Sequence, residues 1–143
     1  MKRVMTSALL VGAVSSCFFV PRPLAAQQCQ DEEAMVADYK KDLGKLVETT
    51  RKESQADFEK AFHQKTCLTK LTLFVSMVNE LMACLEKASG DSTAAKDQVE
   101  AYKTKSAANS KLKDKLEENR KSLKGTGDSK AAKAFIQKLD YTD

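Results

Sequence analysis

Residues 67–88 decide the fold, and they read CLTKLTLFVSMVNELMACLEKA. Apolar side chains recur at steps of three and four, which predicts one stripe along a helix: Leu68, Leu71, Phe74, Val75, Val78, Leu81, Met82 and Leu85. Four further residues widen that stripe: Leu73, Met77, Ala83 and Cys84. A helix that is apolar over so much of its circumference should be packed on more than one side. Ser89-Gly90 then predicts its end, since glycine is common just past a helix.

A second helical pattern precedes this one, over residues 31–65. Its stripe comprises Met35, Val36, Tyr39, Leu43, Leu46 and Val47, resumed by Phe58, Ala61 and Phe62. The stripe fades from Thr49 to Glu53, and Ser54 followed by Asp57 resembles a capping box. The segment is therefore one long helix, which we favour, or two helices with a joint near Lys52–Ser54.

Two more helices follow. Asp91 or Ser92 can cap a long and mostly polar helix over 92–124, and Gly125-Thr126-Gly127 ends it. Asp128 or Ser129 can cap a short amphipathic helix over 130–139. No segment alternates apolar and polar residues with β-branched enrichment, so we expect no sheet. The sequence therefore predicts an all-α fold with a single domain over 27–143. We expect an up-and-down bundle of three to four helices, in which two of the helices could form one long hairpin.

The first 26 residues have the layout of a secretory signal. Lys2 and Arg3 precede an apolar run over 4–20, and the segment closes on Leu24-Ala25-Ala26. We expect cleavage after Ala26, a secreted or periplasmic protein, and no stable membrane span after processing. As a minor alternative, Val14-Ser15-Ser16-Cys17 resembles the lipobox of bacterial lipoproteins, in which Cys17 would carry the lipid.

Removing this signal changes the charge balance. It carries three of the 24 basic residues and none of the 20 acidic ones, so the formal net charge falls from +4 to +1. A near-neutral domain gives no reason to expect nucleic acid as a partner. The basic segment 101–124 and the acidic segment 31–42 are instead natural counterparts for each other, within one chain or between chains.

Three cysteines remain, and helix geometry limits their pairing. Cys67 and Cys84 are separated by about 25 Å along one continuous helix at 1.5 Å per residue, which excludes a bond between them. If the first helix ends near Lys52, an antiparallel return brings Cys84 beside Cys29, and this is the pairing we favour. If residues 31–65 form one straight helix, no bridge forms easily. We expect Cys67 to be a free cysteine that is buried as a small apolar residue.

Candidate catalytic chemistry is sparse. His63 is the only histidine, and with Cys67 it forms an i,i+4 pair that is too small for a convincing metal site. No glycine-rich phosphate loop is present. The adjacent carboxylates Glu32/Glu33 and Glu117/Glu118 belong to solvated helix faces. We therefore expect no catalytic, cofactor-binding or metal residues, no cofactor, and no enzyme activity.

These observations favour an exported, non-enzymatic binding or structural module that acts through helix surfaces. We expect its partner to be another protein or a second copy of the chain. The polar 92–124 helix has too few apolar residues to cover residues 67–88 alone, so either the tail helix over 130–139 or a second copy in a homodimer must complete the core. The candidate partner or ligand surface, if it is not simply bundle core, comprises Leu71, Phe74, Val75, Met77, Val78, Leu81 and Met82. The alternative is a small carrier that holds an apolar ligand between helices, which would need an enclosed apolar cavity.

Overall fold

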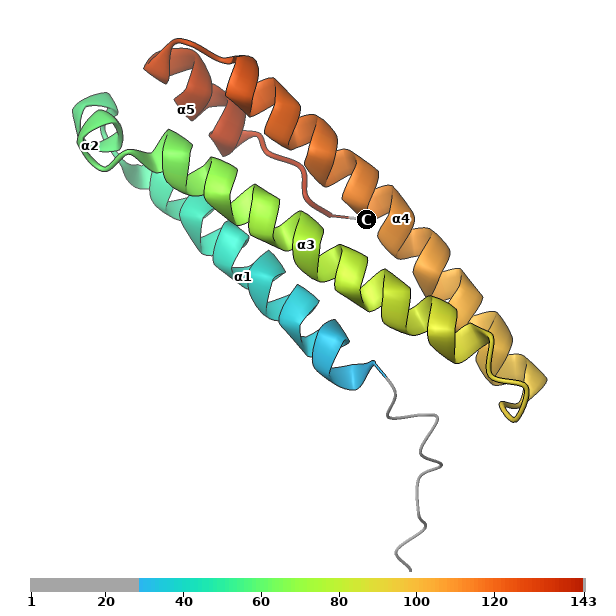
Figure 1. Ribbon diagram of the computed structural model, residues 1–143. Helices are drawn as coiled ribbons and strands as arrows, with labels where there is room; N and C mark the ends of the chain where they lie inside the picture. The colour runs from blue at the N-terminus through green and yellow to red at the C-terminus, as the bar shows by residue number, and fades with distance from the viewer. Residues whose placement is uncertain (1–28, 143) are drawn as a thin grey trace, which may run out of the picture.

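The computed structural model describes residues 29–142, and these form an all-α bundle. Its five helices are α1 (Gln30–Lys52), α2 (Gln55–Lys60), α3 (His63–Ser89), α4 (Lys96–Gly125) and α5 (Ser129–Gln137). The long helices α1, α3 and α4 run up and down beside one another (Figure 1). The predicted signal over 1–26, its cleavage site and Cys17 lie outside the described residues.

Helix α3 is the centre of the bundle. Its inward side chains are buried at alternating steps of three and four residues: Leu71, Phe74, Val78, Leu81 and Leu85. Both α1 and α4 pack against α3, whereas α1 and α4 make few direct contacts with each other in this part of the chain. The three long helices therefore form a layer that is open along the line between α1 and α4.

Helix α5 fills one end of that opening. It contacts all four other helices, and its Ala132 and Ile136 are fully buried in the same core cluster as Leu116 and Leu123 of α4. The core at this end is thus completed by the chain's own tail helix. This is one of the two solutions that the polar character of α4 predicted.

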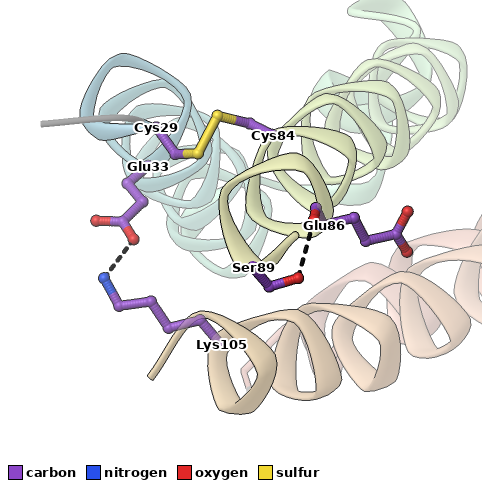
Figure 2. Close-up of a disulfide and its surroundings, with 6 residues drawn as sticks. All are labelled: Cys29, Glu33, Cys84, Glu86, Ser89 and Lys105. Atoms are coloured by element: carbon purple, nitrogen blue, oxygen red, sulfur yellow. Dashed lines mark hydrogen bonds and ion pairs between the residues drawn. A yellow bond between two sulfur atoms is a disulfide. The ribbon is translucent and has the colours of Figure 1, made fainter. Parts of the chain in front are cut away.

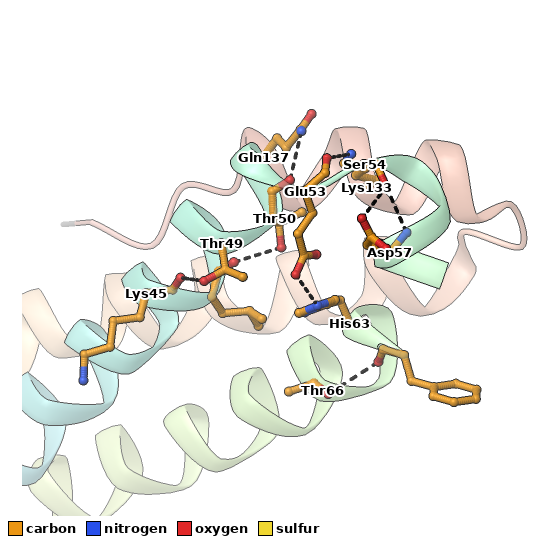
Figure 3. A network of polar contacts seen from close by, with 12 residues as sticks. Lys45, Thr49, Thr50, Glu53, Ser54, Asp57, His63, Thr66, Lys133 and Gln137 are labelled. Carbon is orange, nitrogen blue, oxygen red and sulfur yellow. Dashed lines mark hydrogen bonds and ion pairs between the residues drawn. The ribbon is translucent and has the colours of Figure 1, made fainter. Parts of the chain in front are cut away.

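The expected single helix over 31–65 is wrong, since the chain breaks after Lys52. Glu53 takes an extended conformation, and Ser54 caps α2 by accepting a hydrogen bond from the Asp57 amide at 3.1 Å. The alternative joint near Lys52–Ser54 is the one observed. Tertiary contacts hold it, because Lys133 of α5 donates to the Glu53 carbonyl oxygen (Figure 3).

Three helix ends also differ from the prediction. Helix α3 begins at His63, before residue 67, and α5 ends at Gln137, before residue 139. Helix α4 begins at Lys96, not near residue 92, because Asp91 accepts hydrogen bonds from the amide and hydroxyl of Thr93 and closes a local turn instead. The cap predicted for α5 is confirmed: Asp128 accepts from the Lys130 and Ala131 amides.

Cys29 and Cys84 form the predicted disulfide, with their Cα atoms 5.8 Å apart. The bond joins the start of α1 to the last turns of α3 (Figure 2). It forms because α1 stops at Lys52: helices of 23 and 27 residues then run antiparallel and bring these ends together. A structural disulfide is typical of proteins in oxidising compartments.

We predict that the double variant Cys29→Ser/Cys84→Ser loses roughly 3–4 kcal/mol of unfolding free energy. The bond closes a loop of 55 residues, and the stabilisation from restricting the unfolded chain grows with loop length. Urea denaturation followed by circular dichroism measures the loss, and reduced wild-type protein should match the variant. A loss under about 1 kcal/mol would contradict this account of the bond.

Candidate functional site

Most of the predicted partner surface on α3 is core. Leu71, Phe74, Val78 and Leu81 are at most 2% exposed and cannot meet a partner directly. The other three residues, Val75, Met77 and Met82, are half-buried on the shoulders of α3. The structure therefore places the seven residues on one helix but does not gather them into one exposed patch.

The clearest binding geometry is the opening between α1 and α4, which we call the α1–α4 groove. Residues 138–142 leave α5 and lead toward the middle of the molecule (Figure 1). Contacts with Lys115 and Asn119 of α4 and with Gly44 of α1 place them in this groove. Their side chains alternate as in an extended strand: Leu139 is buried and Tyr141 half-buried, whereas Lys138, Asp140 and Thr142 are exposed. The chain thus binds a short extended peptide of its own.

Two α4 side chains hold the main chain of this tail. Asn119 donates to the Asp140 carbonyl oxygen at 2.6 Å, and Lys115 donates to the Thr142 carbonyl oxygen at 2.6 Å. Lys115 also pairs with the Asp140 carboxylate at 3.0 Å. On the α1 side, a Cβ atom added to Gly44 would lie 3.0 Å from the Tyr141 hydroxyl, so the absence of a side chain leaves room for the ring.

Beyond the tail, the groove continues as an open hollow of about 360 Å³. It begins one helical turn past the tail's contacts, at Lys40 on α1 and Leu112 on α4. Buried Val36, Leu81 and Leu112 form its apolar base, with the small side chain of Ala108 beside them.

An ion pair marks the far end of this hollow. Lys105 of α4 donates to the Glu33 carboxylate of α1 (Figure 2). This contact joins the acidic 31–42 segment to the basic 101–124 segment, as the charge pattern suggested. The open hollow therefore combines an apolar base with charged groups at its rim, which suits a ligand that has both apolar and polar groups.

The only histidine, His63, lies at the other end of the molecule and is half-buried. The His63 Nε2 atom lies 3.0 Å from Glu53 Oε1 (Figure 3). The His63 ring also stacks on Phe58, with 5.7 Å between the ring centroids. Among the described residues, Glu53 Oε2 and His63 Nδ1 are buried without a hydrogen-bond partner. No local sequence pattern indicated this pair, because Glu53 and His63 meet only through the break between α1 and α2.

The turn before α3 exposes an aromatic ring. Phe62 is 64% exposed and has a φ of 52°, a left-handed conformation that is uncommon for a bulky residue. The ammonium group of Lys65 lies 5.3 Å from the centre of the ring. The nearby hollow of about 150 Å³, which Phe58, Phe62 and His63 help to line, is smaller than the α1–α4 groove.

Among residues 29–142, the cysteines offer no metal ligands in this state. Cys29, Glu32 and Cys84 lie close together, but the two sulfur atoms are bonded to each other and neither is a thiolate. Cys67 is a buried free thiol, as the sequence suggested, and burial raises its pKa to about 12. At neutral pH this thiol is protonated and packed in the core, so it is not a nucleophile.

Sequence reasoning missed the tail as an occupant of the groove. The signal that could have found it is the alternation of Leu139 and Tyr141 with polar residues directly after a helix. That pattern is short, and it does not indicate that residues 138–142 would contact α1 and α4.

In comparisons with protein-family models, curated proteins and solved structures, nothing matches this chain.

We predict that Gly44→Ala has little net effect in the wild-type chain but stabilises a Tyr141→Phe chain by about 0.5–1 kcal/mol. Alanine favours a helix interior over glycine by about this amount, and in the wild type the gain is offset by the contact with the Tyr141 hydroxyl. Urea denaturation of all four chains measures the difference. An equal effect of Gly44→Ala in both backgrounds would mean that the ring does not rest against Gly44.

The contacts of the Asp140 carboxylate should weaken at low pH. The hydrogen bond from Lys115, together with those from the Thr142 amide and hydroxyl, lowers the pKa of Asp140 to about 2. Because this pKa is below that of an unfolded aspartate, the contribution is complete above about pH 4 and is lost as pH falls toward 2. NMR of the Thr142 amide between pH 5 and 2 should follow this loss.

Asp140→Asn is the matched control for that titration. The asparagine cannot ionise, so the step that belongs to Asp140 should vanish while the other carboxylates titrate as before. A Thr142 amide titration that is the same in both chains would show that the Asp140 charge does not hold the tail.

Proposed function

We propose that this protein is an exported, non-enzymatic binding module whose α1–α4 groove receives an extended segment of a protein partner. The observation that carries the proposal is the chain's own tail, which occupies one half of the groove in extended form while the other half is open. The disulfide supports an oxidising compartment, and the signal-like N-terminus supports export.

The tail suggests the chemistry of the partner segment. Leu139 and Tyr141 face inward at alternate positions, and an amide and an ammonium group of α4 hold the carbonyl oxygens of Asp140 and Thr142. A partner segment of the same kind would place apolar side chains on Val36, Leu81 and Leu112 and would present main-chain oxygens to α4. Such recognition combines main-chain hydrogen bonds for affinity with side-chain contacts for specificity.

A carrier of an apolar ligand is the second candidate function. The apolar base of the hollow favours it, but the hollow is open along one side, whereas carriers usually enclose most of the ligand surface. An open groove on a filled core fits a protein or peptide ligand better than a small lipid-like one.

Selection of peptides from a displayed random library on the purified protein tests the proposal. Ala108→Trp fills the groove, and Ala107→Trp is the matched control, because Ala107 is an exposed alanine on the same helix that does not line the groove. We expect selected peptides with alternating apolar residues, whose affinity falls at least tenfold in Ala108→Trp and stays within twofold in Ala107→Trp.

Two outcomes would overturn the proposal. One is the recovery of no peptide whose binding depends on Ala108. The other is Ala108-dependent binding of a fatty acid such as decanoate without any such peptide, which would favour the carrier instead.

A further inference from the structure

Helix α4 carries the same pair of side chains twice along the α1–α4 groove. Lys115 precedes Asn119 by four residues, and Lys105 precedes Asn109 by four residues. Residues four apart lie on one face of a helix, so each lysine is beside its asparagine. The first pair holds the tail, and the second pair lines the open hollow. Both halves of the groove therefore present donors of the same kind at the same spacing.

The contacts of the tail show what such a pair recognises. Lys115 and Asn119 donate to two tail carbonyl oxygens, those of residues 142 and 140. Four residues of an α-helix advance about 6 Å, and two residues of an extended chain advance about 6.7 Å. Because these lengths nearly match, a lysine and an asparagine four residues apart fit alternate carbonyl oxygens of an extended segment.

The second pair has donors left for such a segment. Asn109 Nδ2 donates to the Lys105 carbonyl oxygen at 2.9 Å, and a carboxamide nitrogen carries a second N–H. The Lys105 ammonium donates to the Glu33 carboxylate (Figure 2), and an ammonium group carries three N–H donors. Lys115 shows that one ammonium can serve two acceptors, since it binds a carboxylate and a carbonyl oxygen of the tail together.

The second pair also lies on the path of the tail. From residue 140 to residue 142 the tail passes from Asn119 to Lys115, and hence toward Asn109 and Lys105. Asn109 is ten residues before Asn119, which is about 15 Å along the helix, or about four to five residues of an extended chain. The open hollow thus continues an interface that already binds an extended peptide.

We propose that Lys105 and Asn109 hold the partner segment in the open hollow by donating to two of its main-chain carbonyl oxygens, two residues apart. This inference rests on the proposed function, since it assigns the residues that recognise the partner. The segment is extended and not helical, because the carbonyl oxygens of a helix are bonded within that helix. Its inward side chains contact the apolar base of the hollow, as Leu139 and Tyr141 of the tail face inward in the other half.

Removal of each donor tests the assignment. The probe is the tightest of the selected peptides whose binding depends on Ala108, labelled for fluorescence anisotropy. We expect Lys105→Met to weaken its binding about tenfold and Asn109→Ala about fivefold, from the loss of a charged and a neutral hydrogen bond. Lys121→Met and Asn79→Ala are the matched controls, because both residues are exposed and lie outside the hollow, and binding should stay within about twofold. Circular dichroism confirms that each chain is folded.

An ester scan of the same peptide tests whether main-chain oxygens are what the pair recognises. Replacing one amide by an ester makes its carbonyl oxygen a weaker acceptor. Two replacements that lie two residues apart should weaken binding to the wild type. One effect should vanish in Lys105→Met and the other in Asn109→Ala, since the donor is then already missing. A merely structural role of either residue would leave the ester effects unchanged.

The outcomes separate this inference from the function on which it rests. An Ala108-dependent peptide that binds either variant as tightly as the wild type would overturn the inference and leave the proposed function standing. Ester effects that are equal in all chains would do the same. A selection that yields no Ala108-dependent peptide would overturn both.

Discussion

One constraint shapes the part of the chain that the structure describes: α3 is its one strongly apolar helix, and the helices around it are too polar to enclose it. Helices α1 and α4 each contribute a narrow apolar stripe and pack on two sides of α3. Their stripes do not meet, so water would reach the core between them. The chain returns as α5 to close one end of this opening, and Ala132 and Ile136 become fully buried there.

The break in the chain after Lys52 is the second feature on which the arrangement of the helices depends. It shortens α1 to a length that matches α3, and the matched lengths bring Cys29 beside Cys84. It also places Glu53 where Lys133 and His63 can reach it. The disulfide holds one end of the α1–α3 pair while the contacts around Glu53 hold the other, so the two helices are fixed at both ends.

The remaining surfaces follow from the layer arrangement. Three helices side by side have two broad faces, and α5 with the tail covers only part of one of them (Figure 1). What is left is an open half-groove on one side and the uncovered face of α3 on the other. The proposed binding function uses the surface that this packing leaves open.

The sequence by itself determined the helical class, the central helix over 67–88, the caps at Ser54 and Asp128, and the pairing of Cys29 with Cys84 once α1 was allowed to end at Lys52. These features depend on residues within a few helical turns or on simple lengths, which a pattern records. Only the tertiary structure decided that the chain breaks at Glu53, that His63 is paired, and that residues 138–142 lie in the groove. Each of these needs a contact that the local pattern does not contain; Lys133 meets Glu53 across 80 residues of sequence, for example. Local helix propensity carries no information about contacts between residues that only tertiary packing brings together.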